Sequence, residues 1–426
     1  MGLKLAVVAD DSTGATDAAG MAAESGLRTL FVPDGTRSPD QYSQLGMDVL
    51  VVGTQSRSVD PTQAYTTSEL VYRNIAPLKP GRVQFKICST FDSTRAGNIG
   101  QGLDAALAVF GFTSAFVVPA LPVNGRTTYM GHHFVHAQLL SESSLKDHPL
   151  NPMTDPNLVR WLGFQTEERV GLLSLPEILK GAETMRERRQ ALERESNRYI
   201  IADAVIQKDI DDLVRAFPDD FFWCGSSGAT LSLARLLSSG KPPMHVPSEL
   251  GMRTLVISGS MSVQSGRQLD DARASGFTMV PLDIAEASPA DWSPERTLAA
   301  VESAYARGNK VAVYLEQGTP ERSIDVRPEV LNARVGELAA LIVERCDPAR
   351  IVVAGGETSG AVCRACNFDA FVVGKQISPG VPLCFPTDDP EKVVVLKSGN
   401  FGAADLYERI ASLQCATGSA AHPFHL

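Results

Sequence analysis

The chain has 426 residues, which is too long for one hydrophobic core and predicts two domains or three. Its 44% hydrophobic and 21% charged residues exclude a disordered protein. The formal net charge of -10 should repel nucleic acid and anionic membranes, so neither is expected as a partner. An anionic substrate would therefore need a local group of basic side chains. No apolar run has the length of a signal peptide core or a membrane span.

The seven cysteines follow no regular spacing. An odd number of cysteines in a long chain predicts reduced thiols and a cytoplasmic location. The pair Cys363 and Cys366 has CxxC spacing, but there is no second pair for zinc and the segment is expected to be helical. Packed thiols are therefore preferred over a redox or metal site.

The first predicted strand, at 3–9, ends in two carboxylates. This short apolar run stops at Asp10 and Asp11, ahead of a helix of small residues at 15–25. A carboxylate at such a strand end can bind Mg²⁺, accept a hydrogen bond from a sugar hydroxyl or take its proton. The alternative is structural, with Asp11 or Ser12 capping the helix.

Basic residues lie at or near the ends of the next predicted strands. These strands are expected at 47–54, 83–87 and 116–119, and the last is followed by Asn124 and Gly125. One basic residue alone would be an ordinary surface charge, but four on the same edge of a sheet could supply the basic group that an anion requires. They are Arg57, Lys86, Arg95 and Arg126.

The segment 85–100 reads as a strand that stops, a polar loop and a helix that starts at 99. In open α/β sheets, ligands bind where loops and helix N-termini meet beyond the carboxyl ends of the strands. Asp92 and Ser93 in this loop can reach a small polyhydroxylated anion. The alternative is a capped helix start, with Asp92 or Asn98 as the cap.

Three histidines follow closely. The spacings among His132, His133 and His136 could place two of them on one helix face, which raises the possibility of a metal. No cysteine and no glutamate at zincin spacing accompanies them. Hydrogen-bonding or helix-lining histidines are therefore preferred, and metal ligands remain unknown.

The second half of the chain contains three glycine loops, each between a predicted strand and a helix. The strands are expected at 254–257, 351–354 and 393–396. Glycines let a backbone approach phosphate oxygens, and free N–H groups at a helix start bind them. None of the loops matches GxGxxG or the Walker A pattern. The candidate nucleotide-binding residues are Ser258, Gly259, Ser260, Gly355, Gly356, Glu357, Thr358, Ser359, Gly399, Asn400 and Gly402.

A proline-rich segment between glycines divides the chain. It predicts a linker at 241–252 between a first domain at 1–240 and a second at 253–415, with a loose tail at 416–426. Both domains alternate strands and helices, so the expected fold is α/β, with two domains that have largely parallel sheets and an active-site cleft between them.

Seven motifs, in order along nearly the whole chain, carry a resemblance to a known family. They are VADDSTGATD, CSTFDSTRAGNIG, PVNGRTTYMGHHFV, LLSESSLKDHPLNPMTD, SGSMS, GGETSGA and KSGNFG. Together they resemble the four-carbon acid sugar kinases, and specifically the 3-oxo-tetronate 4-kinase branch. The sequence departs from that branch at Ser12, Met130, His133 and the GSSGAT motif, which puts the exact substrate in doubt but not the kinase class.

The resemblance implies a sugar-acid domain followed by an ATP domain. It implies that ATP with Mg²⁺ phosphorylates the terminal hydroxyl of a four-carbon acid, most closely 3-oxo-tetronate. Asp92 or Asp11 would orient or deprotonate that hydroxyl, and the sequence does not decide between them. The residues implied for the sugar acid are Asp10, Arg57, Lys86, Ser93, Asn124, Gly125 and Arg126.

Two other functions remain open from the sequence. The substrate could be threonate, erythronate or 4-hydroxythreonine, or the protein could be a nucleotide-linked dehydrogenase of four-carbon acids. The lack of GxGxxG followed by an acidic residue counts against a dehydrogenase. The stereochemistry of the acid and the oligomeric state cannot be read from the sequence.

Overall fold

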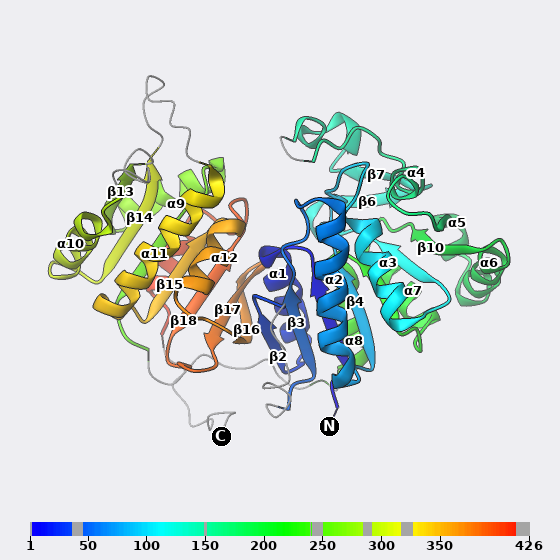
Figure 1. The fold of residues 1–426 in the computed structure, drawn as a ribbon, viewed down its shortest axis with the longest axis horizontal. Coiled ribbons are helices and arrows are strands. Elements are labelled where there is room, and N and C mark those ends of the chain that lie inside the picture. The colour runs from blue at the N-terminus through cyan, green and yellow to red at the C-terminus, as the bar shows by residue number, and fades with distance from the viewer. Residues whose placement is uncertain are drawn as a thin grey trace. The chain divides into compact units, whose positions relative to one another are not determined.

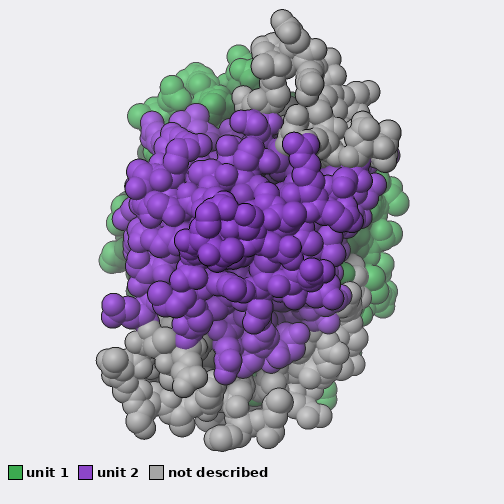
Figure 2. Space-filling model, turned by 90° about the vertical axis from the view of Figure 1, so that its left-hand side faces the viewer, with its two compact units in different colours: residues 1–242 green, residues 243–426 purple. Residues whose placement is uncertain are grey.

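The computed structural model describes two compact units, residues 1–242 and residues 243–426 (Figure 2). Each is treated by itself. The expected linker at 241–252 lies mostly outside the described residues, and the expected tail lies entirely outside them. The described ranges are 2–35, 46–148, 151–238, 240, 250–283, 292–316 and 327–414.

The first unit is built on a sheet in which every neighbouring pair of strands is parallel. Its order is β2-β3-β1-β4-β11-β5-β10-β9. Figure 1 labels β2, β3, β4 and β10 of this sheet. The central strands are short apolar runs buried along their length, as strands covered by helices on both faces should be. The strands are β1 (Leu5–Ala9), β2 (Thr29–Val32), β3 (Val49–Gly53), β4 (Arg82–Lys86), β5 (Ala115–Val118), β9 (Arg169–Leu173), β10 (Asn197–Ala202) and β11 (Phe222–Gly225).

Helices of the first unit pack against its sheet in groups: α1 contacts α8 and α8 contacts α7, whereas α2 contacts α3. Both α1 and α2 contact β1, which lies between β3 and β4 in the sheet. The charged segment at 176–197, whose sequence predicts one helix, forms two helices instead, because Gly181 adopts a φ of 97° that interrupts the helix. The helices are α1 (Ser12–Glu24), α2 (Pro61–Ile75), α3 (Ile99–Phe110), α4 (Leu158–Gly163), α5 (Leu175–Ile178), α6 (Ala182–Arg194), α7 (Gln207–Ala216) and α8 (Ser227–Leu237).

A small antiparallel sheet follows β5. It consists of β6 (Arg126–Tyr129), β7 (His132–Val135) and β8 (Gln138–Leu139). The helical setting considered for the three histidines is therefore wrong, since His132 and His133 lie in β7. Short 3-10 turns precede and follow this sheet, at Pro122–Asn124, Leu140–Glu142 and Ser144–Asp147.

The second unit is also α/β, with the order β13-β14-β12-β15-β18-β17-β16. The first five strands are parallel, and β17 pairs antiparallel with β18 and with β16. An α/β fold with largely parallel sheets was predicted and is confirmed; the antiparallel hairpin was not predicted. The elements are β12 (Thr254–Ser258), α9 (Val263–Ala274), β13 (Thr278–Asp283), α10 (Pro294–Tyr305), β14 (Lys310–Glu316), α11 (Pro328–Cys346), β15 (Arg350–Ala354), α12 (Gly356–Ala365), β16 (Phe371–Ser378), β17 (Val381–Pro386), β18 (Val393–Lys397) and α13 (Leu406–Ala411).

Within the described ranges, no helix combines the length and the apolar character needed to cross a membrane.

Close packing of α3 on β4 gives a test of this fold. An added methyl at Gly102 would overlap the ring of Phe85, which is fully buried in the strand that leads to the polar loop. We expect Gly102→Ala to lower the free energy of unfolding by about 1–3 kcal/mol, as overpacking does. The measurement is urea unfolding followed by circular dichroism.

The matched control is Gly163→Ala, also in a helix of the first unit. A methyl at Gly163 would meet no atom within 4 Å. Alanine is the better helix former, so stability should stay equal or rise by up to about 1 kcal/mol. Equal effects of the two substitutions would contradict the packing described for α3.

Candidate functional site

Asp10 and Asp11 share one largely buried arginine at the carboxyl end of β1. Arg57 donates from Nε and Nη2 to the two carboxylate oxygens of Asp10 at 3.1 and 2.7 Å. Its Nη2 also donates to Oδ1 of Asp11 at 2.6 Å. Burial raises the pKa of Asp10 despite this arginine. Burial also raises the pKa of Asp11, but the charges of Arg57 and Lys86 and the hydrogen bonds from Thr13 and Gly14 together outweigh burial, so the pKa of Asp11 lies below its usual range.

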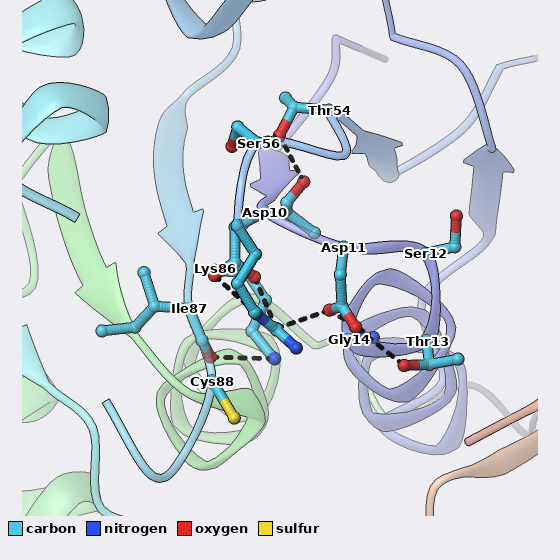
Figure 3. Close-up of polar contacts among 12 residues, drawn as sticks. Asp10, Asp11, Ser12, Thr13, Gly14, Thr54, Ser56, Lys86, Ile87 and Cys88 are labelled. Atoms are coloured by element: carbon cyan, nitrogen blue, oxygen red, sulfur yellow. Dashed lines mark hydrogen bonds and ion pairs between the residues drawn. The ribbon is translucent and has the colours of Figure 1, made fainter. Parts of the chain in front are cut away.

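Asp11 also caps α1, as the structural interpretation of the sequence predicts. Its carboxylate accepts from the backbone N–H of Gly14 at 2.9 Å and from the hydroxyl of Thr13 at 2.8 Å (Figure 3). The ammonium of Lys86 lies beside the same turn, since a methyl at Gly14 would be 2.9 Å from it. Lys86 is buried and donates to the carbonyl of Ile87 at 3.0 Å.

Carboxylates balance the basic side chains of this cluster. Asp17 is buried in α1, where burial raises its pKa and the charge of Lys86 opposes that shift. Three carboxylates, those of Asp10, Asp11 and Asp17, therefore face the two cations Arg57 and Lys86. These five residues alone do not form the basic group that an anionic substrate requires.

The loop between β4 and α3 contains polar groups that the described residues do not satisfy. Oδ1 of Asp92 is buried without a hydrogen-bond partner among them, and so are both amide atoms of Asn98. Asn98 occupies the N-cap position of α3 but makes no side-chain capping bond. Buried polar atoms without partners are rare and call for an explanation such as a bound ligand. Asp92 and Asn98 therefore stay available to a ligand.

Ser93 of the same loop has a different role. Its hydroxyl donates to the carbonyl of Phe91 at 2.9 Å and accepts from Trp161 Nε1 and Gln165 Nε2, both at 3.0 Å. The residue is fully buried. Ser93 therefore joins the loop to α4 and to the segment after α4. These three hydrogen bonds give no support to the predicted contact between Ser93 and a substrate.

Arg126 differs from Arg57 because no carboxylate pairs with it among the described residues. It begins β6, just after the turn of Asn124 and Gly125, and its guanidinium donates to the Asn124 carbonyl while Nε is buried without a partner. Burial lowers the pKa of Arg126. Cys88 lies within electrostatic range of both Arg57 and Arg126, so the two arginines lie in one neighbourhood. The fourth predicted cation, Arg95, instead stacks over the Phe164 ring at 3.9 Å.

His133 fastens the small sheet to the same loop. Its Nε2 donates to the Ser89 carbonyl at 2.8 Å, which leaves Nδ1 to accept from the Thr128 hydroxyl at 3.0 Å. The histidine is fully buried, and burial lowers its pKa to about 4. A neutral hydrogen-bonding histidine, as preferred from the sequence, therefore positions β6 and with it Arg126.

The three glycine loops of the second unit meet at the carboxyl ends of β12, β15 and β18. A methyl at Gly259 would overlap the Thr358 side chain, and one at Gly399 would overlap the Ser260 hydroxyl. Only glycine permits so close an approach of these loops. The loops also place the N-termini of α9 and α12 at this edge, where backbone N–H groups can bind an anion.

Side chains hold the three loops in place. Thr358 donates to Asn332 at 2.8 Å, and Asn332 in turn donates to Glu357 at 2.9 Å, which fixes the first turn of α12 against α11. The Gly399 carbonyl accepts from Ser262 at 2.8 Å and Ser265 at 3.0 Å in α9 and its cap. Gln268 donates to the carbonyls around Gly402, at the end of the third loop.

In the part of the chain that the structure describes, no group of three or more His, Cys, Asp or Glu side chains could hold a metal ion. The six described cysteines are free. Burial raises the pKa of Cys366 to about 12, and Cys363 is buried inside α12, so the CxxC pair consists of unreactive packed thiols.

Comparisons with known proteins match both units. A family model described as a sugar-binding N-terminal domain matches residues 5–233, and one described as a nucleotide-binding C-terminal domain matches residues 255–407. A 3-oxo-tetronate kinase of Methylobacterium radiotolerans is 38% identical, covering 96% of this chain and 99% of the relative. One of Pseudomonas savastanoi pv. phaseolicola is 37% identical, covering 95% and 96%. The chain belongs to the four-carbon acid sugar kinase family, in its 3-oxo-tetronate kinase branch.

Solved structures agree with this assignment of family. A crystal structure of a Salmonella typhimurium LT2 protein, 31% identical, matches with a TM-score of 0.81 and covers 95% of this chain and 98% of that chain. One of a Haemophilus influenzae protein, also 31% identical, matches with a TM-score of 0.77 over the same shares. As a member of this family, the chain is a phosphotransferase with an alcohol group as acceptor.

Two residues of this kinase were not singled out from the sequence as site residues. Asn98 was considered only as a helix cap, and its unused amide appears only once the loop is folded. Lys397 opens the third glycine loop and is fully buried. A lysine directly after an apolar run, before a glycine loop, is the one sequence signal that could have indicated it.

The buried His133 predicts a pH dependence of stability. Its pKa is about 4 in the fold and near 6.5 when unfolded, so the unfolded chain binds the proton first. This contribution to stability is complete above pH 6.5 and is lost as the pH falls towards 4. We expect the loss of this contribution to lower the free energy of unfolding by about 2 kcal/mol between pH 7 and pH 5.

The measurement compares urea unfolding of the wild type and His133→Asn at both pH values. The variant keeps a hydrogen-bonding side chain that does not titrate, and all carboxylates are common to both proteins. The wild type should therefore lose more stability on acidification than the variant. Parallel losses would contradict a buried neutral histidine.

Proposed function

We propose that this kinase transfers the γ-phosphoryl group of ATP to the terminal 4-hydroxyl of a four-carbon sugar acid, with 3-oxo-tetronate as the substrate. The names of the relatives, which align over nearly the whole chain, support the acid, and the nucleotide-binding match supports ATP. Threonate, erythronate and 4-hydroxythreonine remain the other acceptors. Membership of a kinase family leaves the dehydrogenase alternative without support. The cytoplasmic location and the cleft between the units stay predictions.

The second unit fits the phosphates of a nucleotide. The loops have no side chain at Gly259 and Gly399, where one loop approaches another. The helices α9 and α12 begin at the same edge of the sheet. ATP would supply the phosphoryl group. No described acidic cluster could hold a metal by itself, which agrees with a Mg²⁺ held largely by phosphate oxygens and water. Its protein ligands are not assigned.

The first unit fits the acid. Arg126 has an unpartnered guanidinium nitrogen and no carboxylate beside it among the described residues, so a substrate carboxylate can pair with it. Arg57 is engaged through Nε and Nη2 by Asp10 and Asp11, which leaves Nη1 as a further donor. This arrangement favours Arg126 as the main partner of the substrate carboxylate, with Arg57 as a second hydrogen-bond donor to it.

Asp92 fits the acceptor hydroxyl better than Asp11 does. Both oxygens of Asp11 accept hydrogen bonds within the protein, and its pKa lies below the usual range, which makes it a poor proton acceptor. Oδ1 of Asp92 has no partner among the described residues. Asp92 would accept the hydrogen bond of the substrate hydroxyl and orient its oxygen, and Asn98 of the same loop also has unpartnered amide atoms. The unpartnered Oδ1 is the observation that carries this proposal.

The deciding experiment is an assay of ADP release with a panel of four-carbon acids. We expect 3-oxo-tetronate to give the highest kcat/KM and its product to carry the phosphate on the 4-hydroxyl, which ³¹P and ¹H NMR can assign. Higher kcat/KM with threonate, erythronate or 4-hydroxythreonine would reassign the substrate. No ADP release with any of these acids would overturn the proposal.

Asp92→Asn tests the role of the carboxylate. An amide of the same shape cannot take the proton of the hydroxyl, so we expect kcat to fall roughly 100-fold or more. The KM for ATP should stay nearly unchanged, because Asp92 lies in the first unit. Steady-state kinetics with both substrates provide the measurement.

Asp60→Asn is the control for Asp92→Asn, since asparagine can replace the exposed aspartate that caps α2. It should keep wild-type kinetics. Asp11→Asn, which the sequence also nominates, should lower stability as well as turnover, because Asp11 caps α1. Wild-type turnover in both Asp92→Asn and Asp11→Asn would contradict the proposal that one of these carboxylates orients or deprotonates the acceptor hydroxyl.

Arg126→Gln tests the anchor for the substrate carboxylate. Loss of a charged hydrogen bond should raise the KM for the acid roughly 10- to 100-fold while the KM for ATP stays nearly constant. Arg95→Gln is the control, because that guanidinium stacks on Phe164. If both variants keep the wild-type KM for the acid, the carboxylate is held elsewhere.

A further inference from the structure

A fully buried lysine lies under the third glycine loop. Lys397 is the last residue of β18, and its side chain is wholly inaccessible to solvent. Its strand is paired in register with its neighbours, so Ser258, Ala354 and Lys397 stand side by side at the carboxyl ends of β12, β15 and β18. Lys397 thus lies where the three loops begin.

The ammonium of Lys397 is poorly satisfied. Its acceptor among the described residues is the Gly399 carbonyl at 3.2 Å. The same carbonyl accepts from Ser262 at 2.8 Å and from Ser265 at 3.0 Å, so three donors share an oxygen that has two lone pairs. Lys397 makes the longest of these contacts and has three N–H groups to place. At least two of them lack an acceptor among the described residues.

No opposite charge among the described residues compensates Lys397. Burial alone lowers its pKa to about 8, with no charged group contributing to the shift. The Glu357 carboxylate is engaged by Asn332. Arg350 stands at the opposite end of β15, paired with Val393. The titratable residues on the elements that contact β18 are Arg350 in β15, Cys384 in β17, and Glu357, Cys363 and Arg364 in α12.

We propose that Lys397 binds a phosphate oxygen of the nucleotide at the junction of the three glycine loops. This inference rests on the proposed function, because it takes the ligand of the second unit to be a nucleoside triphosphate. A buried cation with unused donors is costly unless an anion completes its hydrogen bonds. The backbone N–H groups of the loops and the ammonium of Lys397 would then bind the same phosphate chain.

The first test is the affinity of Lys397→Met for a series of ligands, measured by calorimetry. Methionine has a similar length without the charge. We expect affinity for MgATP to fall roughly 10- to 100-fold, with smaller losses for MgADP and AMP and about none for adenosine. Lys375→Met, which removes an exposed lysine of β16, should bind all four ligands like the wild type.

The second test uses the wild type and does not depend on how the variant folds. An anion beside Lys397 raises the pKa of the ammonium, so binding of ATP near pH 8 should take up roughly half a proton. Calorimetry at one pH in two buffers with different ionisation enthalpies measures this uptake. It should be absent in Lys397→Met.

The results separate the inference from the proposed function. ATP binding to the wild type without proton uptake would overturn the inference and leave the kinase intact. Equal weakening of adenosine and ATP in Lys397→Met would also overturn it, since that pattern belongs to a lysine that only holds the loop. Failure of ATP to bind the wild type would overturn both.

Discussion

The register of parallel strands decides which charges meet in each unit. Ala9 of β1 is level with Gly53 of β3 and with Lys86 of β4, so the loops after these three strands begin at the same height. That alignment lets Arg57 reach Asp10, although 47 positions separate them in the sequence. The second unit repeats the arrangement with β12, β15 and β18. A slip of one residue would turn each of these side chains to the opposite face of its sheet.

Burial then separates the charged groups that hold the site together from those that can bind a ligand. Arg57 is matched by two carboxylates, and removing the arginine would leave the buried Asp10 carboxylate without its ion-pair partner, which is strongly destabilising. Arg126, Asp92 and Lys397 are buried in whole or in part without such a partner among the described residues. The matched cluster supports the fold of the loops, and we propose that the unmatched groups bind the ligands.

Local pattern in the sequence is enough to predict most strands of the parallel sheets and the loops that follow them, because buried strands are apolar runs with polar ends. It does not predict the β16–β17 hairpin, where Gly374 and Pro382 interrupt the strand pattern. It also cannot show that Asp10 and Asp11 neutralise the charge of Arg57. Nor can it show that the Ser93 hydroxyl accepts hydrogen bonds from Trp161 and Gln165. Those facts depend on contacts between distant segments, about which periodicity carries no information.

An acidic protein that binds two anions has to solve a problem of charge. A basic surface patch would be a weak solution, because a net charge of -10 opposes it and salt screens it over about 8 Å. A buried cation without a countercharge acts in a medium of lower dielectric constant, where its attraction for an anion is far stronger. Lys397, which is fully buried, and Arg126, which is partly buried, lack a countercharge among the described residues, and burial lowers the pKa of both. If these cations bind the ligands as we propose, the desolvation that makes them costly in the free protein also favours anions that can replace water completely.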